Sequence, residues 1–202
     1  MLPPILQHMK TLGHVVFTGA DFDLNLFGIR AKADEPNAFN DLLGCAYMVN
    51  GEWKVHYWQA TTDPGLFYRQ NPMNVKGTAV LVPGQYRGVY KIDGHGQAGY
   101  SALCQRNGSV SVYRQRRSET LDLDPSTIDE GSNFGINIHA PSTHPYDHER
   151  DLRDGRSGIG RWSAGCQVHA QNRTFRTMMD LARQQIRHNG WETFTYSLIL
   201  EP

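Results

Sequence analysis

Short runs in which hydrophobic and polar residues alternate follow one another along most of the chain. Alternation with a period of two places the apolar side chains on one face of a strand, so these runs predict β-structure. The clearest signal is Asn50-Gly51, which separates the β-prone residues 45–49 from residues 53–61 and predicts a two-residue hairpin. We therefore expect a mainly β protein of the α+β class, with a curved mixed or antiparallel sheet or a sandwich.

The other β-prone runs are separated by residues that favour turns. They predict strands at residues 14–18, 24–30, 77–82, 85–92, 100–105, 110–114 and 193–200. We expect the runs on either side of Pro83-Gly84 to pair with each other, and those on either side of Arg106-Asn107-Gly108 to continue the meander. Residues 34–43 contain Glu-Pro-Asn and Asn-Asp, which predict a loop with one helical turn.

Two segments carry the periodicity of a helix. Apolar residues at helical spacing follow Pro3-Pro4 and predict a short N-terminal helix that ends at Gly13. A longer helix is expected over residues 172–188, with Asn172 as its cap and Asn189-Gly190 as its end. The apolar stripe that should pack on the sheet consists of Phe175, Met178, Met179, Ala182 and Ile186. No repeat or linker divides the chain, so residues 1–202 predict a single domain.

Composition narrows the range of functions. The chain has 202 residues with 20 basic and 20 acidic side chains, which argues against nucleic acid or an anionic membrane as a partner. No apolar run is long enough to span a membrane, and the N-terminus lacks the basic and apolar regions of a signal peptide. The three cysteines, Cys45, Cys104 and Cys166, suit either three free thiols or one Cys45–Cys104 disulfide.

Candidate chemistry is concentrated in two segments. Ser163-Ala164-Gly165 forms a small-residue turn that delivers Cys166 onto the start of a short strand, and residues 134–139 form an alternating run that ends in His139. An imidazole next to a thiol is a common way to generate the thiolate nucleophile at neutral pH. The alternative is that Cys166 is a small buried core residue, as most cysteines are.

These segments resemble the catalytic signature of the L,D-transpeptidase (YkuD-like) family. In that family a strand ending in Ile-His-Gly is followed by a loop and then by Ser-His-Gly-Cys, and His139, Ser163, Gly165 and Cys166 match that motif position by position. The matching region covers roughly residues 45 to 170. Three positions differ: Ala164 stands for the second histidine, Ala140 for the glycine after the first, and Val168 for an arginine.

The resemblance implies an L,D-transpeptidase-like fold and an enzyme that acts on the stem peptide of peptidoglycan without a metal or other cofactor. Cys166 would attack a stem-peptide carbonyl, and His139 would take the thiol proton. Backbone N–H groups of Gly165 and Cys166 would form the oxyanion hole, and a carbonyl near Ala140 would fix the imidazole tautomer. The resulting thioester would then be resolved by an acceptor amine or by water.

Three further residues are expected to contact the substrate, with Ser163 supporting the turn. They are Asn137, Arg161 and Trp162. Arginine binds carboxylates in a bidentate manner, so Arg153, Arg156 or Arg161 could bind a substrate carboxylate in place of the arginine for which Val168 stands. Asn137 could instead complete the hydrogen bonding of its own strand.

Other interpretations are open at this stage. The long segment 140–161 holds His144, His148 and several carboxylates, which could form a zinc site, a lid over the cleft or a solvated loop. Without a signal peptide, a phage particle or a secretion apparatus would have to carry an enzyme made in the cytoplasm to the cell wall or periplasm. The alternative function is a non-catalytic structural or binding module, such as a virion or tail component that keeps the fold.

Overall fold

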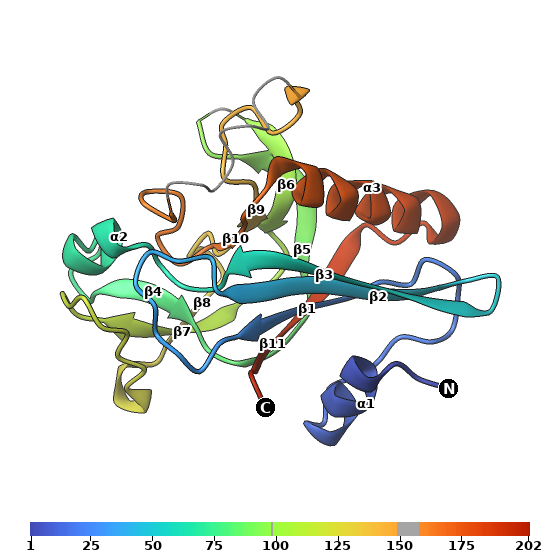
Figure 1. Cartoon of the computed structure of the whole chain (residues 1–202), viewed down its shortest axis with the longest axis horizontal. Helices are drawn as coiled ribbons and strands as arrows, with labels where there is room; N and C mark the ends of the chain where they lie inside the picture. Colours follow the sequence, from blue (N-terminus) through green and yellow to red (C-terminus); the bar gives the residue numbers. More distant parts are fainter. Residues whose placement is uncertain (98, 149–157) are drawn as a thin grey trace.

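Most of the strands belong to one curved sheet that closes on itself. The structure is a computed structural model and describes residues 1–97, 99–148 and 158–202. Within these residues, the strands of the sheet are β1 (Asn25–Arg30), β2 (Asp41–Val49), β3 (Glu52–Thr61), β5 (Gly84–His95), β6 (Tyr100–Gln105), β9 (Ile138–His139), β10 (Gln167–His169) and β11 (Thr193–Leu200). They close into a barrel in the order β1-β11-β5-β6-β9-β10-β3-β2 (Figure 1).

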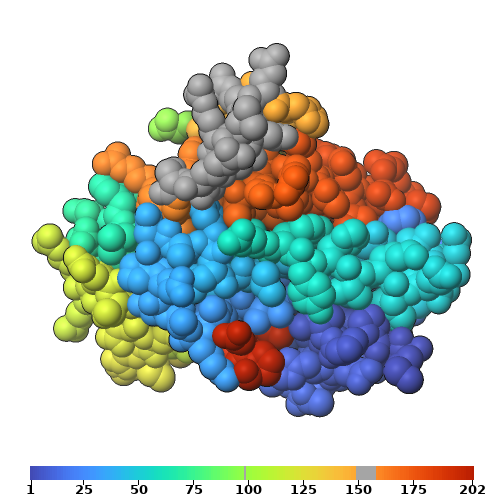
Figure 2. Space-filling model, in the orientation of Figure 1, coloured from blue at the N-terminus to red at the C-terminus, as the bar shows by residue number. Residues whose placement is uncertain are grey.

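In the described part of the chain, a smaller sheet and three α-helices lie around the barrel. The small sheet has the order β4-β7-β8 and consists of β4 (Thr78–Leu81), β7 (Val110–Gln115) and β8 (Asp129–Gly131). The α-helices are α1 (Pro4–Thr11), α2 (Leu66–Gln70) and α3 (Asn172–Asn189), and a 3₁₀ helix covers Pro125–Thr127. The space-filling view shows α1 and α3 on opposite sides of the β2–β3 hairpin (Figure 2).

The expected mainly β class and the long helix near the C-terminus are confirmed, as is the hairpin. β2 and β3 pair antiparallel up to Val49 and Glu52, so Asn50 and Gly51 are the two loop residues. Both have positive φ, 51° for Asn50 and 78° for Gly51, which is the conformation that favours Asn-Gly in a tight hairpin. Gly190 ends α3 with a φ of 70°, but the N-cap is Gln171 rather than Asn172.

The expected pairing around Pro83-Gly84 is wrong. β4 pairs with β7 in the small sheet, whereas β5 pairs with β6 and β11 in the barrel. The chain therefore passes from one sheet to the other at Pro83, where a hairpin was expected. The expected pairing on either side of Arg106-Asn107-Gly108 is also wrong, because β6 is a barrel strand and β7 lies in the small sheet. Turn residues show where a strand ends, but they do not specify which strand it pairs with.

The N-terminal segment 14–18 is not a strand. The side-chain amide of Asn25 accepts from the Phe17 N–H and donates to the Phe17 carbonyl, at 2.8 and 2.9 Å. The side-chain amide of Gln85 does the same for Val15, at 2.9 and 2.8 Å. Side-chain amides thus replace the backbone ladder that the β-prone sequence predicted. The expected loop 34–43 is also shorter than predicted, because its last three residues belong to β2.

The barrel interior and the face of α3 share one hydrophobic core. The buried apolar residues of α3 are Phe175, Met178, Met179, Leu181 and Ala182, which include most of the predicted stripe. On another face, α1 packs Leu6 and Met9 against Phe27 and Ile199 of the barrel. Cys45, Cys104 and Cys166 are all free thiols.

Buried charges join the end of β1 to the turn after β3. The Arg30 side chain is 2% exposed, and its Nε lies 2.9 Å from Asp63 Oδ1. Its Nη1 donates to the Leu81 carbonyl at 2.9 Å, and its Nη2 donates to the Thr62 carbonyl at 3.0 Å. Arg30 therefore ties the barrel to the connection with the small sheet.

Candidate active site

The two predicted chemical segments lie on neighbouring strands. β9 and β10 are parallel partners, with Ile138 opposite Gln167 and His139 opposite Val168. Cys166 immediately precedes β10, so this register places it opposite Asn137 and diagonally across from His139. Parallel pairing thus brings together residues that are 27 positions apart in the sequence, as the positions of the motif predicted.

The turn before Cys166 depends on Ser163 and Gly165. Ser163 Oγ donates to the Cys166 carbonyl at 2.8 Å and accepts from the Gly165 N–H at 3.2 Å. Gly165 has a φ of 124°, and a Cβ there would lie 2.3 Å from the Ala79 carbonyl oxygen, so only glycine fits. The Gly165 N–H, expected in an oxyanion hole, already has an acceptor. Within the described part of the chain the Cys166 N–H has none, so it is the better-placed donor.

The Cys166 thiol is held by the backbone of the neighbouring segment. Its Sγ donates to the Gly135 carbonyl at 3.2 Å and accepts from the Asn137 N–H at 3.5 Å. No hydrogen bond joins it to the His139 side chain in this structure. Burial raises the pKa of the thiol to about 11, and the Asn137 N–H opposes that shift. The resting thiol is therefore protonated.

The His139 imidazole is buried and held by carbonyl groups. Its Nδ1 lies 2.8 Å from the Ala140 carbonyl oxygen. A carbonyl only accepts, so Nδ1 carries the proton in this contact, as expected for a carbonyl that fixes the tautomer. Burial and the neighbouring His95 lower the pKa of His139 to about 3, while the carbonyls of Ala140 and Trp162 act in the opposite direction. The ring is neutral at physiological pH.

Two residues of the β5–β6 hairpin complete this cluster and were not anticipated from the sequence. The His95 ring stacks on His139 with centroids 4.0 Å apart, and the Tyr100 hydroxyl lies 3.5 Å from His139 Nδ1. His95 Nδ1 also lies 3.0 Å from Asn137 Nδ2. Neither residue belongs to a recognisable motif, and only the β6–β9 pairing brings them to the site. No sequence signal could have identified them.

The three residues that were expected to contact the substrate differ in their surroundings. Asn137 uses its amide within the protein, because Oδ1 accepts from the Gln105 N–H at 2.9 Å and Nδ2 contacts His95. The Arg161 guanidinium lies over the Phe67 ring, 3.9 Å from its centroid. Trp162 is 37% exposed and is therefore accessible to a substrate. Arg153 and Arg156 lie outside the described residues.

Two of the positions that differ from the family motif, Val168 and Ala164, have different surroundings in the structure. Val168 is fully buried against Phe39 and Ile159, where an unpaired arginine would be strongly disfavoured. Ala164 lines a cavity of about 240 Å³ with Tyr68 and Phe134, next to the small sheet. A cavity is therefore present on that side of the turn before Cys166.

The segment 140–161 is described only in part. Among the described residues, no three His, Cys, Asp or Glu side chains gather closely enough to hold a metal ion. Thr143 Oγ1 and His144 Nδ1 lie 2.8 Å apart, and Arg176 of α3 donates to the Pro145 carbonyl at 2.8 Å, which joins this segment to α3. The carboxylates Glu149, Asp151 and Asp154, which the alternative zinc site would need, lie outside the described part, as do residues 149–157 of the expected lid.

Comparison with known proteins adds no assignment. No protein-family model, curated protein or solved structure matches the chain. In the described residues, no helix is both long and apolar enough to cross a membrane.

Proposed function

We propose that the chain is a cysteine-dependent acyl-transfer enzyme that acts on peptide bonds of the peptidoglycan stem. It would work as an L,D-transpeptidase or as an L,D-carboxypeptidase or endopeptidase, with an L,D-transpeptidase-like fold. Cys166 is the nucleophile and His139 is the base. The proposal is supported by the parallel pairing of β9 with β10, whose register sets Cys166 diagonally across from His139 on the neighbouring strand.

The first step needs the thiol and the imidazole to meet. Rotation of the Cys166 side chain away from the Gly135 carbonyl would direct Sγ toward His139, whose Nδ1 stays bonded to the Ala140 carbonyl. Nε2, the ring nitrogen that does not carry the proton, would then accept the thiol proton as the sulfur attacks the substrate carbonyl carbon. The Cys166 N–H would donate to the oxyanion that forms.

The second half of the cycle returns the proton. Collapse of the tetrahedral intermediate breaks the scissile C–N bond, and the imidazolium protonates the departing amine. The remaining thioester is attacked by an acceptor amine in transpeptidation or by water in hydrolysis, which restores the thiol. The residues at the site favour neither acceptor, so the reaction products must decide between them.

A non-catalytic structural or binding module is the second candidate, and a specific observation favours it. The thiol hydrogen-bonds only to backbone groups in the described structure, and burial raises its pKa to about 11. An inert cysteine in a core position would have this environment. Under this alternative, the protein would keep the fold as a component of a virion or tail and would carry no activity.

One experiment separates the two functions. Purified peptidoglycan is incubated with the wild-type protein and with Cys166→Ala, and the released or cross-linked stem peptides are identified by mass spectrometry. Products that appear with the wild type and disappear with Cys166→Ala support the enzyme. Products from neither protein, with both correctly folded, support the non-catalytic module. The products themselves distinguish transpeptidation from hydrolysis.

A further inference from the structure

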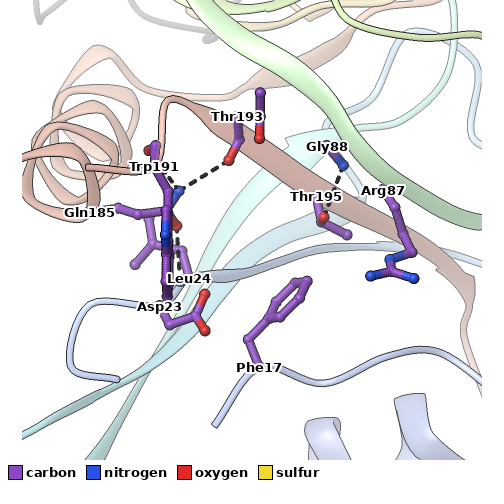
Figure 3. Close-up of a pocket in the computed structure, with 9 residues that line it drawn as sticks. All are labelled: Phe17, Asp23, Leu24, Arg87, Gly88, Gln185, Trp191, Thr193 and Thr195. Carbon is purple, nitrogen blue, oxygen red and sulfur yellow. Dashed lines mark hydrogen bonds between the residues drawn. The ribbon is translucent and has the colours of Figure 1, made fainter. Parts of the chain in front are cut away.

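A second cavity lies at the opposite end of α3 from Cys166. It has a volume of about 540 Å³, within the usual range for small-ligand sites. Its lining combines the segment before β1, the first half of β5, the end of α3 and the start of β11 (Figure 3): Phe17, Asp23, Leu24, Arg87, Gly88, Gln185, Trp191, Thr193 and Thr195. α3 has 18 residues and spans roughly 27 Å at 1.5 Å per residue, so this cavity is well separated from Cys166.

Two opposite charges line this cavity without neutralising each other. Within the described residues, Asp23 and Arg87 have no ion-pair partner, and neither side chain forms a hydrogen bond. Figure 3 shows the Asp23 carboxylate and the Arg87 guanidinium on either side of the Phe17 ring. Burial raises the pKa of Asp23 to about 6, and no neighbouring cation counteracts this shift. A half-buried carboxylate without a partner would gain from a ligand that carries a positive charge.

The backbone that presents Asp23 is held in place. Phe22, which precedes it, has a φ of 55°, and its ring stacks on Tyr47 and His188 with centroids 5.6 and 4.5 Å away. The Phe22 N–H also donates to the Met48 carbonyl at 2.9 Å. A non-glycine residue in the left-handed region carries a conformational cost that these contacts offset. The turn therefore fixes Asp23 at the cavity wall.

The opposite walls are also preorganised. The Gln185 amide accepts from the Leu24 N–H at 3.1 Å and donates to the Trp191 and Thr193 carbonyls at 3.3 and 3.1 Å. Thr195 Oγ1 accepts from the Gly88 N–H at 3.0 Å, which joins β11 to β5 beside Arg87. Trp191 is 46% exposed and contributes an aromatic surface at the opening. These contacts fix the walls of the cavity before a ligand binds, so only the charged side chains remain to be ordered.

We propose that this cavity binds a short peptide with a free ammonium and a free carboxylate group. The ammonium pairs with Asp23, the carboxylate pairs with Arg87, and the chain between them lies against Phe17 and Trp191. A single amino acid carries both charges on one carbon, whereas an extended tripeptide separates them by about 10 Å. We choose the longer ligand because the two side chains lie on either side of the Phe17 ring (Figure 3). The proposal does not depend on Cys166 or on the proposed peptidoglycan chemistry.

Isothermal titration calorimetry of the full chain with trialanine at pH 7.5 tests this binding. We expect saturable one-site binding by the wild type, and binding at least tenfold weaker with N-acetyl-trialanine, with trialanine amide and with alanine. Asp23→Asn and Arg87→Gln should each weaken trialanine binding by at least tenfold. Glu192→Gln and Arg187→Gln are matched controls, because both side chains are exposed near the cavity without lining it, and they should bind as the wild type does.

Several outcomes would overturn the proposal. They are no binding at millimolar trialanine, binding of either blocked peptide as tight as that of trialanine, and wild-type affinity in either Asp23→Asn or Arg87→Gln. Each blocked peptide lacks one charge of trialanine and is measured on the wild-type protein. This result therefore does not rely on the variants folding. Cys166→Ala should bind trialanine like the wild type, which separates a failure here from a failure of the proposed enzyme activity.

Discussion

The imidazole of His95 stacks on that of His139, with ring centroids 4.0 Å apart and planes inclined by 22°. The two rings come from different strands, β5 and β9, and β6 lies between these strands in the barrel. A second positive charge so close to His139 would be strongly unfavourable, so His95 helps to keep the proposed base neutral. His95 also contacts Asn137, the neighbour of the thiol.

Replacing His95 with glutamine should raise the pKa of His139. Burial is the larger cause of the low pKa and would remain, so the value should rise from about 3 without reaching the ordinary 6.5. NMR titration of the His139 ring protons measures the change directly. His188→Gln, at the far end of α3, is the matched control and should leave the titration unchanged. An unaltered His139 pKa in His95→Gln would show that the stacking has no electrostatic effect.

Cys166 and His139 should behave as one catalytic unit. Under the proposed mechanism, Cys166→Ala, Cys166→Ser and His139→Ala should each lower turnover of peptidoglycan by about 10³-fold or more. Serine fails because the base has to deprotonate a hydroxyl of much higher pKa than a thiol. The double variant Cys166→Ala/His139→Ala should be little worse than either single variant. Substantial activity in His139→Ala would show that another group is the base.

The resting Cys166 thiol should react slowly with iodoacetamide. Because burial raises the pKa from 9.0 to about 11, the thiolate near neutral pH is roughly 100-fold scarcer than for an unshifted thiol. The rate should rise about tenfold per pH unit between pH 7 and pH 10, as followed by mass spectrometry of the peptide containing Cys166. Cys45 and Cys104 are internal controls, because burial raises their pKa values as well.

Added stem peptide distinguishes the two candidate functions in the same assay. If the protein is an enzyme, a bound peptide should change the alkylation rate of Cys166, by shielding the thiol or by releasing it from the Gly135 carbonyl. The rates of Cys45 and Cys104 should stay constant. An alkylation rate of Cys166 that is the same with and without stem peptide would favour the non-catalytic module.

The buried Arg30 should contribute far more to stability than the exposed Arg106. Arg30→Met leaves the Asp63 carboxylate in a buried place without its closest cation, so we expect a loss of about 3–5 kcal/mol in the free energy of unfolding. Arg106→Met breaks an ion pair with Asp93 in which both side chains are exposed and screened by solvent, so its loss in stability should be far smaller. Urea unfolding measures both. Similar losses would show that Arg69, which also approaches Asp63, neutralises it alone.

Local signals account for the parts of the fold that were predicted correctly. Asn50-Gly51 specifies its hairpin through positive φ angles, and the apolar stripe of α3 specifies a face for packing. Neighbouring residues in the sequence do not determine which strands pair. β4 and β5 follow each other in the sequence, yet they belong to different sheets, so the crossing at Pro83 depends on the whole assembly. Asn25 illustrates the same limit, since its side chain satisfies the backbone of a segment that otherwise has the sequence of a strand.

Only those residues of the candidate site that belong to the sequence motif could be predicted. The positions of His139 and Cys166 follow from the Ile-His and Ser-x-Gly-Cys patterns, and the carbonyl of Ala140 follows from its place after the histidine. His95 and Tyr100 come from a hairpin about 40 positions away and reach the site only through the barrel. The occupied N–H of Gly165 depends on the rotamer of Ser163, which no sequence pattern reveals.

Asp23 should make the stability of the protein depend on pH. Burial raises its pKa from 3.8 to about 6 in the folded state, so the folded protein binds this proton more tightly than the unfolded chain. The contribution of Asp23 to stability is therefore greatest below pH 4, falls as the pH rises through 4 to 6, and is lost above that range. Asparagine carries no charge and avoids the loss.

Because Asp23 is only half-buried and solvent screens it, Asp23→Asn should be more stable than the wild type by about 1 kcal/mol at pH 7.5. The difference should vanish near pH 4 in urea unfolding, and Glu192→Gln should show no such trend. An Asp23→Asn variant that is less stable than the wild type at pH 7.5 would mean that the carboxylate has a favourable partner in solution.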